Sequence, residues 1–195
     1  GEKMSGQVNV SGKMFNTLGS NGVNLRAIAQ GSSERNISAV IEEKDVKKAL
    51  NVLHENHFEG SNKVLNLFVV GVGNVGGELV NQIKQQQSKL QENSNIVVRV
   101  AGLANSRKML LDETGIDLES WQDKVEASEE DFDKDALVDQ IAELNLRNSV
   151  FVDCMANYEI ASVYKTALSN NINVVTANKI ACSSDYDLYQ ELKGI

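Results

Sequence analysis

The residues best suited to chemistry form a glycine-rich turn between an apolar run and a long amphipathic stretch. Gly71, Gly73 and Gly76 follow the apolar run 64–70 and give the spacing G-x-G-x-x-G. Between a strand and a helix, the first glycine would make the tight turn and the second would let the backbone approach a pyrophosphate. The third would let the helix pack close to the strand. The turn therefore predicts a dinucleotide site.

The start of the helix after this turn would hold the anionic phosphates. Helix N-termini present free backbone N–H groups, which here belong to Asn74, Val75 and Gly76. A tight turn without any ligand is the alternative, and the strand–turn–helix context favours the ligand.

The next apolar segment would end near the adenosine ribose of a bound dinucleotide. Binders of NAD place an acidic residue there, but this segment ends in Asn105, Ser106, Arg107 and Lys108. A cofactor with a 2′-phosphate would be tolerated or favoured, with Ser106 donating to the phosphate and Arg107 paired with it. We therefore expect NADP to bind at least as well as NAD. The alternative is that both cations are ordinary loop residues.

Two later apolar segments bring further polar residues to the same edge of a sheet. The stretches 152–157 and 174–179 each run from an apolar strand into polar residues, and the second ends in Asn178 and Lys179. Ligands lie beyond the carboxyl ends of parallel strands, so both stretches should face the nicotinamide. The Lys179 ammonium could hold a carbonyl oxygen whose charge changes during hydride transfer. An ordinary surface lysine is an equally open interpretation.

The second half of the chain alternates strands and helices, which predicts a Rossmann-type doubly wound parallel sheet covered on both faces. The sheet is expected to be partial, with four of about six strands. The expected strands are 64–70, 96–104, 150–154 and 172–176, and the expected helices are 74–90, 121–124, 134–144, 157–169 and one from about 183.

The first half is typical of a different α/β unit. Its expected order is a helix capped by Ser11, strands 23–29 and 36–42, and a helix over 44–58. This αββα order is most of a ferredoxin-like unit without its outer strands, so a strand is expected before Gly1. The buried stripe of the second helix is expected to consist of Val46, Ala49, Leu50, Leu53 and His57 or Phe58. A charge step and a local break near residue 60 predict two domains, 1–60 and 61–195.

Composition excludes several classes of protein. The 195 residues carry a net charge of −8 and no proline. A long acidic stretch over 112–143 argues against a nucleic-acid surface, and no apolar run approaches the length of a membrane span. Cys154 and Cys182 form no disulfide framework, which favours the reducing cytoplasm. His54 and His57 lack further ligands nearby in sequence, so no metal site is expected.

These segments, taken in order, resemble the bifunctional aspartokinase/homoserine dehydrogenase family over essentially the whole chain. The stretch 24–38 is similar to the second ACT regulatory unit of those enzymes, and 68–77 is similar to the start of their homoserine dehydrogenase domain. The stretches 103–107, 152–154 and 175–179 fall where that family has its cofactor segments.

The resemblance implies NAD(P)-dependent interconversion of L-aspartate 4-semialdehyde and L-homoserine, in threonine and methionine synthesis. Lys179 would match the family lysine at the nicotinamide, and Met155 and Ala156 would lie beside that ring. Asn24 and Gln30 would contact an amino-acid effector, threonine by analogy. Many relatives have hydroxyl residues where this chain has Met155 and Ala156, and many have proline where this chain has Ala177.

The resemblance also implies a kinase domain before Gly1, and a substrate-binding and dimerising domain after Ile195. We therefore expect a homo-oligomer for the full-length enzyme and no dehydrogenase activity for residues 1–195 alone. The alternatives are a non-enzymatic sensor that joins ACT and nucleotide-binding modules, and another ACT-bearing dehydrogenase. Domain order disfavours both, and the sensor would have no need for Lys179.

Overall fold

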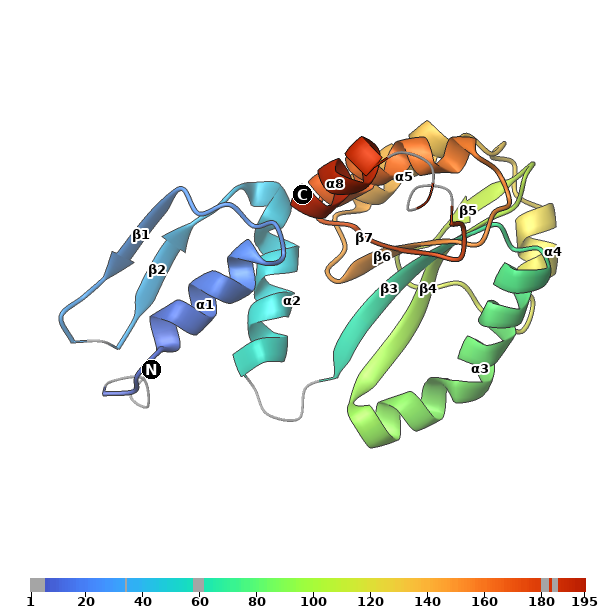
Figure 1. Cartoon of the computed structure of the whole chain (residues 1–195). Coiled ribbons are helices and arrows are strands. Elements are labelled where there is room, and N and C mark those ends of the chain that lie inside the picture. The colour runs from blue at the N-terminus through green and yellow to red at the C-terminus, as the bar shows by residue number, and fades with distance from the viewer. Residues whose placement is uncertain (1–5, 34, 58–61, 180–182, 184–185) are drawn as a thin grey trace. The chain divides into compact units, whose positions relative to one another are not determined.

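The computed structural model describes residues 6–33, 35–57, 62–179, 183 and 186–195, without the side chain of His57. The chain divides into two compact units, Gly1–Ser61 and Asn62–Ile195. The alternation of helices and strands along both units is visible in Figure 1.

The first unit has the predicted order of helix, strand, strand and helix. Its elements are α1 (Val10–Gly19), β1 (Ala27–Gln30), β2 (Ile37–Val40), η2 (Glu43–Asp45) and α2 (Val46–His57). The two strands pair antiparallel, with Ala27 opposite Val40 and Gln30 opposite Ile37. The predicted cap of α1 is wrong. Asn9 is the N-cap, and the Ser11 hydroxyl donates instead to Oε1 of Gln30 at 2.9 Å.

The core of the first unit forms where α1 packs against α2. It consists of Leu18, Val23, Ala49 and Val52, with Met14, Leu25, Ile41 and Leu53 packed around it. The predicted buried stripe of α2 is wrong in part, because Val46 is 42% and Leu50 is 65% exposed. The apolar residues of α2 fit two neighbouring faces, and the helix turns the face that contains Val52 inward. The His57 side chain and Phe58 lie outside the described residues.

The second unit is built on a five-stranded, mostly parallel sheet, which confirms the predicted α/β class. Its strands are β3 (Lys63–Val70), β4 (Ile96–Ala104), β5 (Met109–Leu111), β6 (Ser149–Asp153) and β7 (Asn173–Thr176). They lie in the order β5-β4-β3-β6-β7, and β5 alone runs antiparallel to its neighbour. The short strand β5 was not predicted from the sequence.

Helices cover both faces of this sheet. They are α3 (Asn74–Ser94), α4 (Trp121–Glu126), α5 (Lys134–Leu144), η3 (Glu159–Val163) and α6 (Tyr164–Ser169), and the helix α8 (Tyr186–Gly194) packs against α6. Figure 1 shows α3 and α5 on opposite sides of β3 and β4. The predicted helix over 157–169 is therefore two segments, of which the first is a 3₁₀ turn.

Strand alternation divides the apolar residues of β3 between two cores. Phe68 and Val70 belong to the core beneath α5 and α6, whereas Val69 belongs to the core beneath α3 and α4. Because both faces are covered, β3 reads in the sequence as a nearly continuous apolar run.

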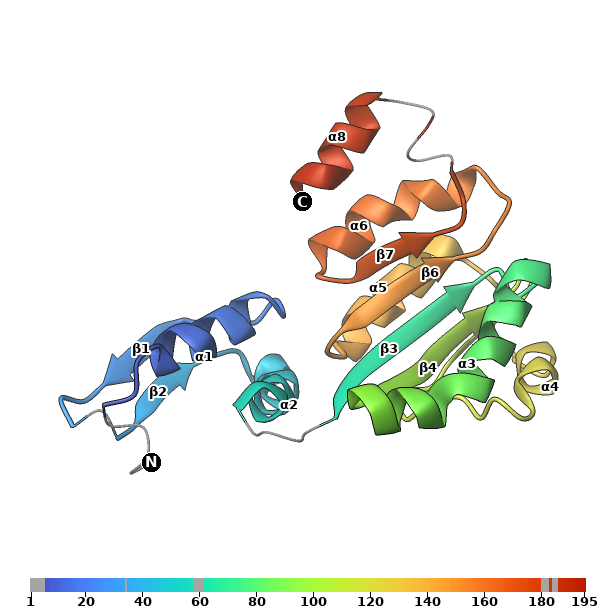
Figure 2. The ribbon, with the colours of Figure 1, turned by 60° about the horizontal axis from the view of Figure 1, so that its bottom comes forward.

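The order of the strands determines where a ligand can bind. After β3 the chain crosses to β4 on one side, and β6 later pairs with β3 on the other side. A crevice forms at such a reversal, beyond the carboxyl ends of the two strands. Figure 2 shows β3 running into the first turn of α3 at this end of the sheet.

Candidate functional site

The turn after β3 can be formed only by glycine at two of its positions. Gly71 has φ +95°, and a Cβ there would lie 2.7 Å from the backbone nitrogen of Met155. A Cβ on Gly76 would lie 2.3 Å from the carbonyl oxygen of Gly71. The backbone N–H groups of Gly71 and Val72 both donate to the carbonyl oxygen of Ala104, which fixes the turn to the end of β4.

The middle glycine of the motif faces open space. No described atom lies within 4 Å of the position that a Cβ on Gly73 would occupy. Gly73 is also the N-cap of α3, where no side chain caps the helix and no acidic residue lies in the first turn of the described helix. The first N–H groups of a helix lack intrahelical acceptors, and the helix dipole favours an anion there. The turn therefore fits the phosphates of a dinucleotide.

A cleft of about 340 Å³ extends from this turn towards the end of β4. Gly73, Asn74 and Asn105 line it together with Trp121, the first residue of α4. The tip of the Trp121 ring lies 3.6 Å from where a Cβ on Gly77 would be, so the ring packs on the start of α3. Trp121 is also a buried residue of the core beneath α3 and α4, so the same ring belongs to the core and to the cleft wall.

The two cationic side chains in the loop after β4 differ in their partners. Oδ1 of Asn105 accepts hydrogen bonds from the backbone nitrogens of Arg107 at 2.7 Å and Lys108 at 2.8 Å. Nζ of Lys108 is paired with Asp131 at 2.9 Å. Ser106 and Arg107 are exposed, and Arg107 has no ion pair within the described part of the chain. Arg107 is thus the cation left available to an anionic ligand.

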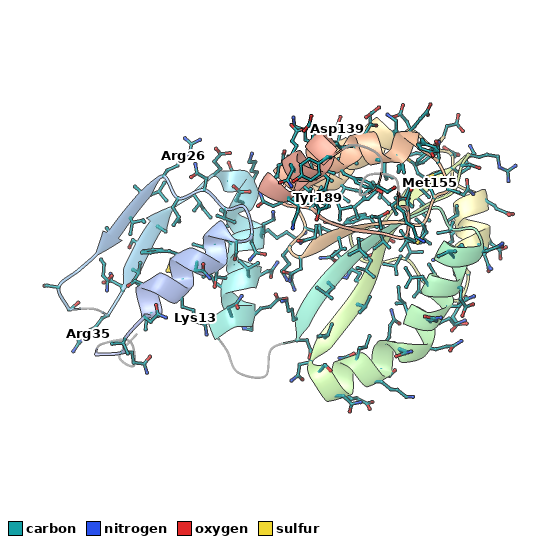
Figure 3. All side chains as sticks on the ribbon, in the orientation of Figure 1. Lys13, Arg26, Arg35, Asp139, Met155 and Tyr189 are labelled. Atoms are coloured by element: carbon teal, nitrogen blue, oxygen red, sulfur yellow. The ribbon has the colours of Figure 1, made fainter. Side chains whose placement is uncertain are left out.

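The turn after β6 lies against the glycine turn. The backbone N–H of Cys154 donates to the carbonyl oxygen of Val70 at 2.8 Å. Met155, labelled in Figure 3, is partly buried against the core, and Ala156 is exposed. Burial raises the pKa of the Cys154 thiol, and the negative charge of Asp153 adds to this effect. Cys154 is therefore a mostly protonated, weakly reactive thiol near neutral pH.

The turn after β7 presents Lys179 next to a buried amide. Asn178 is 9% exposed, and its Nδ2 donates to the carbonyl oxygen of Asn157 at 2.9 Å. Its side chain therefore holds two loops together. Lys179 follows directly and is exposed. The structure thus places Lys179, Met155 and Gly71 at the carboxyl ends of adjacent strands.

The first unit contains a separate cleft of about 260 Å³. Gln30 lines it with Gln7, Asn9 and Ser11, which are polar groups suited to a zwitterionic amino acid. Asn24 is exposed and does not line this cleft.

Neither a metal cluster nor a membrane-spanning helix occurs in the part of the chain that the structure describes. Its His, Cys, Asp and Glu residues nowhere form a group of three suited to a metal ion. None of its helices is both long enough and apolar enough to cross a bilayer.

Comparison with known families identifies both units. Residues 1–57 match the ACT domain family, and residues 71–194 match the family described as homoserine dehydrogenase, NAD binding domain. The NAD(P) cofactor expected from the glycine turn agrees with that description.

Known proteins align with the whole chain. The bifunctional aspartokinase/homoserine dehydrogenase of Haemophilus influenzae is 39% identical over 193 residues, covering 99% of this chain and 23% of the relative. A chloroplastic bifunctional aspartokinase/homoserine dehydrogenase of Zea mays is 39% identical over 196 residues, covering 100% of this chain and 21% of the relative. The chain thus spans between a fifth and a quarter of the length of these relatives.

Solved structures share the fold of the second unit. Homoserine dehydrogenase from Thermoplasma acidophilum matches with a TM-score of 0.53 at 22% identity, covering 68% of this chain and 41% of that one. A hyperthermophilic archaeal homoserine dehydrogenase in complex with NADPH also has a TM-score of 0.53 at 22% identity, covering 67% and 41%.

Proposed function

We propose, from the premise that the chain belongs to the homoserine dehydrogenase family, that it is the ACT and cofactor-binding part of a bifunctional aspartokinase/homoserine dehydrogenase. The full-length enzyme would reduce L-aspartate 4-semialdehyde to L-homoserine with NAD(P)H, in threonine and methionine synthesis. The observation that carries this proposal is the glycine turn after β3. Gly73 faces open space and no side chain caps α3, so the backbone N–H groups at the start of this helix fit a pyrophosphate.

The cofactor would lie across the carboxyl ends of β4, β3 and β6. The backbone of Gly71, Gly73, Asn74, Val75 and Gly76 would hold the pyrophosphate. Asn105 would shape the loop at the adenosine ribose, where Ser106 and Arg107 would bind a 2′-phosphate. Met155 and Ala156 would lie beside the nicotinamide ring.

Lys179 would act at the substrate end of the site. When bound, the reduced cofactor supplies a hydride to the aldehyde carbon, and negative charge then develops on the aldehyde oxygen. An ammonium group held near that oxygen stabilises the charge more in the transition state than in the ground state. Lys179 lies in the turn after β7 and is exposed to solvent, so its ammonium group is accessible to a substrate.

The first unit would bind an amino-acid effector, for which threonine is the candidate. Gln30 would contact it in the cleft that Asn9 and Ser11 also line. Asn24 stays a predicted effector contact, three residues before β1 begins. The full-length enzyme would be a homo-oligomer in the cytoplasm, and residues 1–195 alone would bind the cofactor without turning over homoserine.

A charge placed at the start of α3 tests the proposed cofactor site. Val75 is 59% exposed in the first turn, so Val75→Asp adds a carboxylate without disturbing the core. A carboxylate at a helix N-terminus favours the helix but repels phosphates. We expect the 195-residue chain to bind NADPH in a fluorescence titration, and Val75→Asp to abolish binding. The matched neutral variant Val75→Asn should retain it. Equal binding by both variants would contradict the proposal.

A further inference from the structure

A buried carboxylate lies where the turns after β6 and β7 meet. Asp153, the last residue of β6, is fully buried at 0% exposure. Within the described residues, no cation forms an ion pair with it. A carboxylate accepts hydrogen bonds only, and burying one is costly unless its oxygens are satisfied. The hydrogen-bond donors to the Asp153 carboxylate therefore identify the parts of the chain that this buried group holds together.

One carboxylate oxygen fixes the turn after β6. The backbone N–H of Met155 donates to Oδ1 of Asp153 at 2.7 Å. The same backbone nitrogen lies 2.7 Å from the position that a Cβ on Gly71 would occupy. Asp153 thus holds the Met155 backbone against the glycine turn, on the side proposed for the nicotinamide.

The other oxygen fixes the turn after β7 through two hydroxyl groups. The Tyr164 hydroxyl donates to Oδ2 of Asp153 at 2.5 Å and lies 2.9 Å from Oγ1 of Thr176. Oγ1 of Thr176 lies 3.3 Å from the same Oδ2 and accepts from the backbone N–H of Asn178 at 2.9 Å. A backbone bond from Ala177 to the Asp153 carbonyl, at 2.9 Å, joins the two turns again.

The aromatic ring of Tyr164 keeps its hydroxyl in place. Tyr164 is 3% exposed at the start of α6, and its ring packs edge-on against Phe151 with centroids 6.3 Å apart. Phe151 lies on β6 itself, two residues before Asp153. The strand, the helix and the two turns are therefore connected through one short polar network.

We propose that Asp153, Tyr164 and Thr176 are positioning residues for the nicotinamide end of the cofactor site. The inference rests on the proposed function, and none of the three residues is assigned contact with substrate or cofactor. They act through the backbone of Met155 on one side and through the backbone of Asn178, next to Lys179, on the other. The phosphate end has further bonds of its own, from the backbone N–H groups of Gly71 and Val72 to the carbonyl oxygen of Ala104.

The variant Thr176→Val tests this assignment, because it removes one hydroxyl and preserves the shape of the side chain. Thr176→Ser restores the hydroxyl. Thr166→Val is the matched control, since Thr166 is an exposed threonine of α6. Tyr164→Phe is a second test, because it keeps the ring on Phe151 but removes the donor. The ligands are NADPH and 2′-phospho-ADP-ribose, which is the same molecule without its nicotinamide ring.

We expect Thr176→Val and Tyr164→Phe to weaken NADPH binding about five- to tenfold, an effect of the size of one typical net hydrogen bond. Binding of 2′-phospho-ADP-ribose should stay unchanged in both. Thr176→Ser should restore the affinity for NADPH, and Thr166→Val should leave both affinities unchanged.

The two ligands separate the possible failures. If the wild-type chain binds neither ligand, the proposed function is wrong. If it binds both and the two test variants keep their affinity for NADPH, the positioning role is wrong. Equal weakening for both ligands would also overturn it, since that result indicates general damage to the fold.

Discussion

The carbonyl oxygen of Gly71 lies 2.3 Å from the position that a Cβ on Gly76 would occupy. The first and last glycines of the motif therefore lie in contact across the turn, with no room for a side chain on Gly76. The neighbouring Gly77 differs, because its nearest atom, at the tip of the Trp121 ring, would lie 3.6 Å away in ordinary contact.

The variant Gly76→Ala is expected to lower the free energy of unfolding by about 1–3 kcal/mol, the usual cost of overpacking a closed site. Gly77→Ala is the control, and it should stay within about 0.5 kcal/mol of the wild type or gain stability, since alanine favours the helix. Urea denaturation followed by circular dichroism measures both. Similar losses for the two variants would show that contact with Gly71 is not the cause.

Gly73→Ala should weaken binding without creating a clash inside the fold. Its Cβ would meet no described atom within 4 Å, so the fold has room for the added methyl group. A methyl group there would nevertheless keep the pyrophosphate from approaching the backbone. We expect about tenfold weaker NADPH binding by calorimetry. An unchanged affinity would place the phosphates elsewhere.

Arg107→Gln should shift the preference between the two cofactors. Arg107 is exposed and available, whereas Lys108 is paired with Asp131 at 2.9 Å. We expect the affinity for NADPH to fall about tenfold while that for NADH is unchanged, because only NADPH carries the extra phosphate. Lys108→Gln should change the ratio of the affinities for NADPH and NADH less than Arg107→Gln does. A fall in both affinities for Arg107→Gln would assign the residue to another part of the cofactor.

Asp133 should contribute to the acid sensitivity of the fold. It caps α5 by accepting from the backbone N–H groups of Ala136 at 3.0 Å and Asp135 at 2.9 Å, which holds its pKa below the usual value. A lowered folded-state pKa gives stability that is present above the unfolded value and is lost as pH falls through the folded one. Asp133→Asn can still cap but cannot titrate.

Urea midpoints measured from neutral to acidic pH test this contribution. As pH falls below neutral, the urea midpoint of Asp133→Asn should decrease less than that of the wild type. Asp123→Asn removes an exposed carboxylate of α4 and controls for the change in net charge. Parallel curves for wild type and Asp133→Asn would rule out the cap as a source of the pH dependence.

The sequence predicted most of the second unit because its elements are long and strongly patterned. The helix over 134–144 has the predicted bounds, and β4 matches the predicted strand over 96–104. The strand β5 could not be found in this way. It is only three residues long, which is too short to show an alternation of apolar and polar residues. It forms because Leu111 pairs with Gly102 on β4.

The parts of the site that escaped prediction depend on contacts between distant residues. The sequence places Asp153 at the end of an apolar strand, but it does not show that Tyr164 and Thr176 reach the same carboxylate. Those contacts follow from the register of β6 and β7, in which Asp153 lies opposite Thr176. The buried face of α2 also depends on a contact between distant residues. The helix has two apolar faces, and packing against α1 determines which one is buried.

The two ends of the proposed cofactor site belong to strands that differ in how easily they can open. β3 is paired on both sides, with β4 and β6, whereas β7 is paired only with β6 among the described strands. Local opening begins at weakly held edges and reaches central strands last. In residues 1–195 taken alone, the turn proposed to bind the phosphates would therefore stay formed during fluctuations that release the turn next to Lys179. A dinucleotide would consequently be captured by its phosphates first, and its reactive ring would become ordered last.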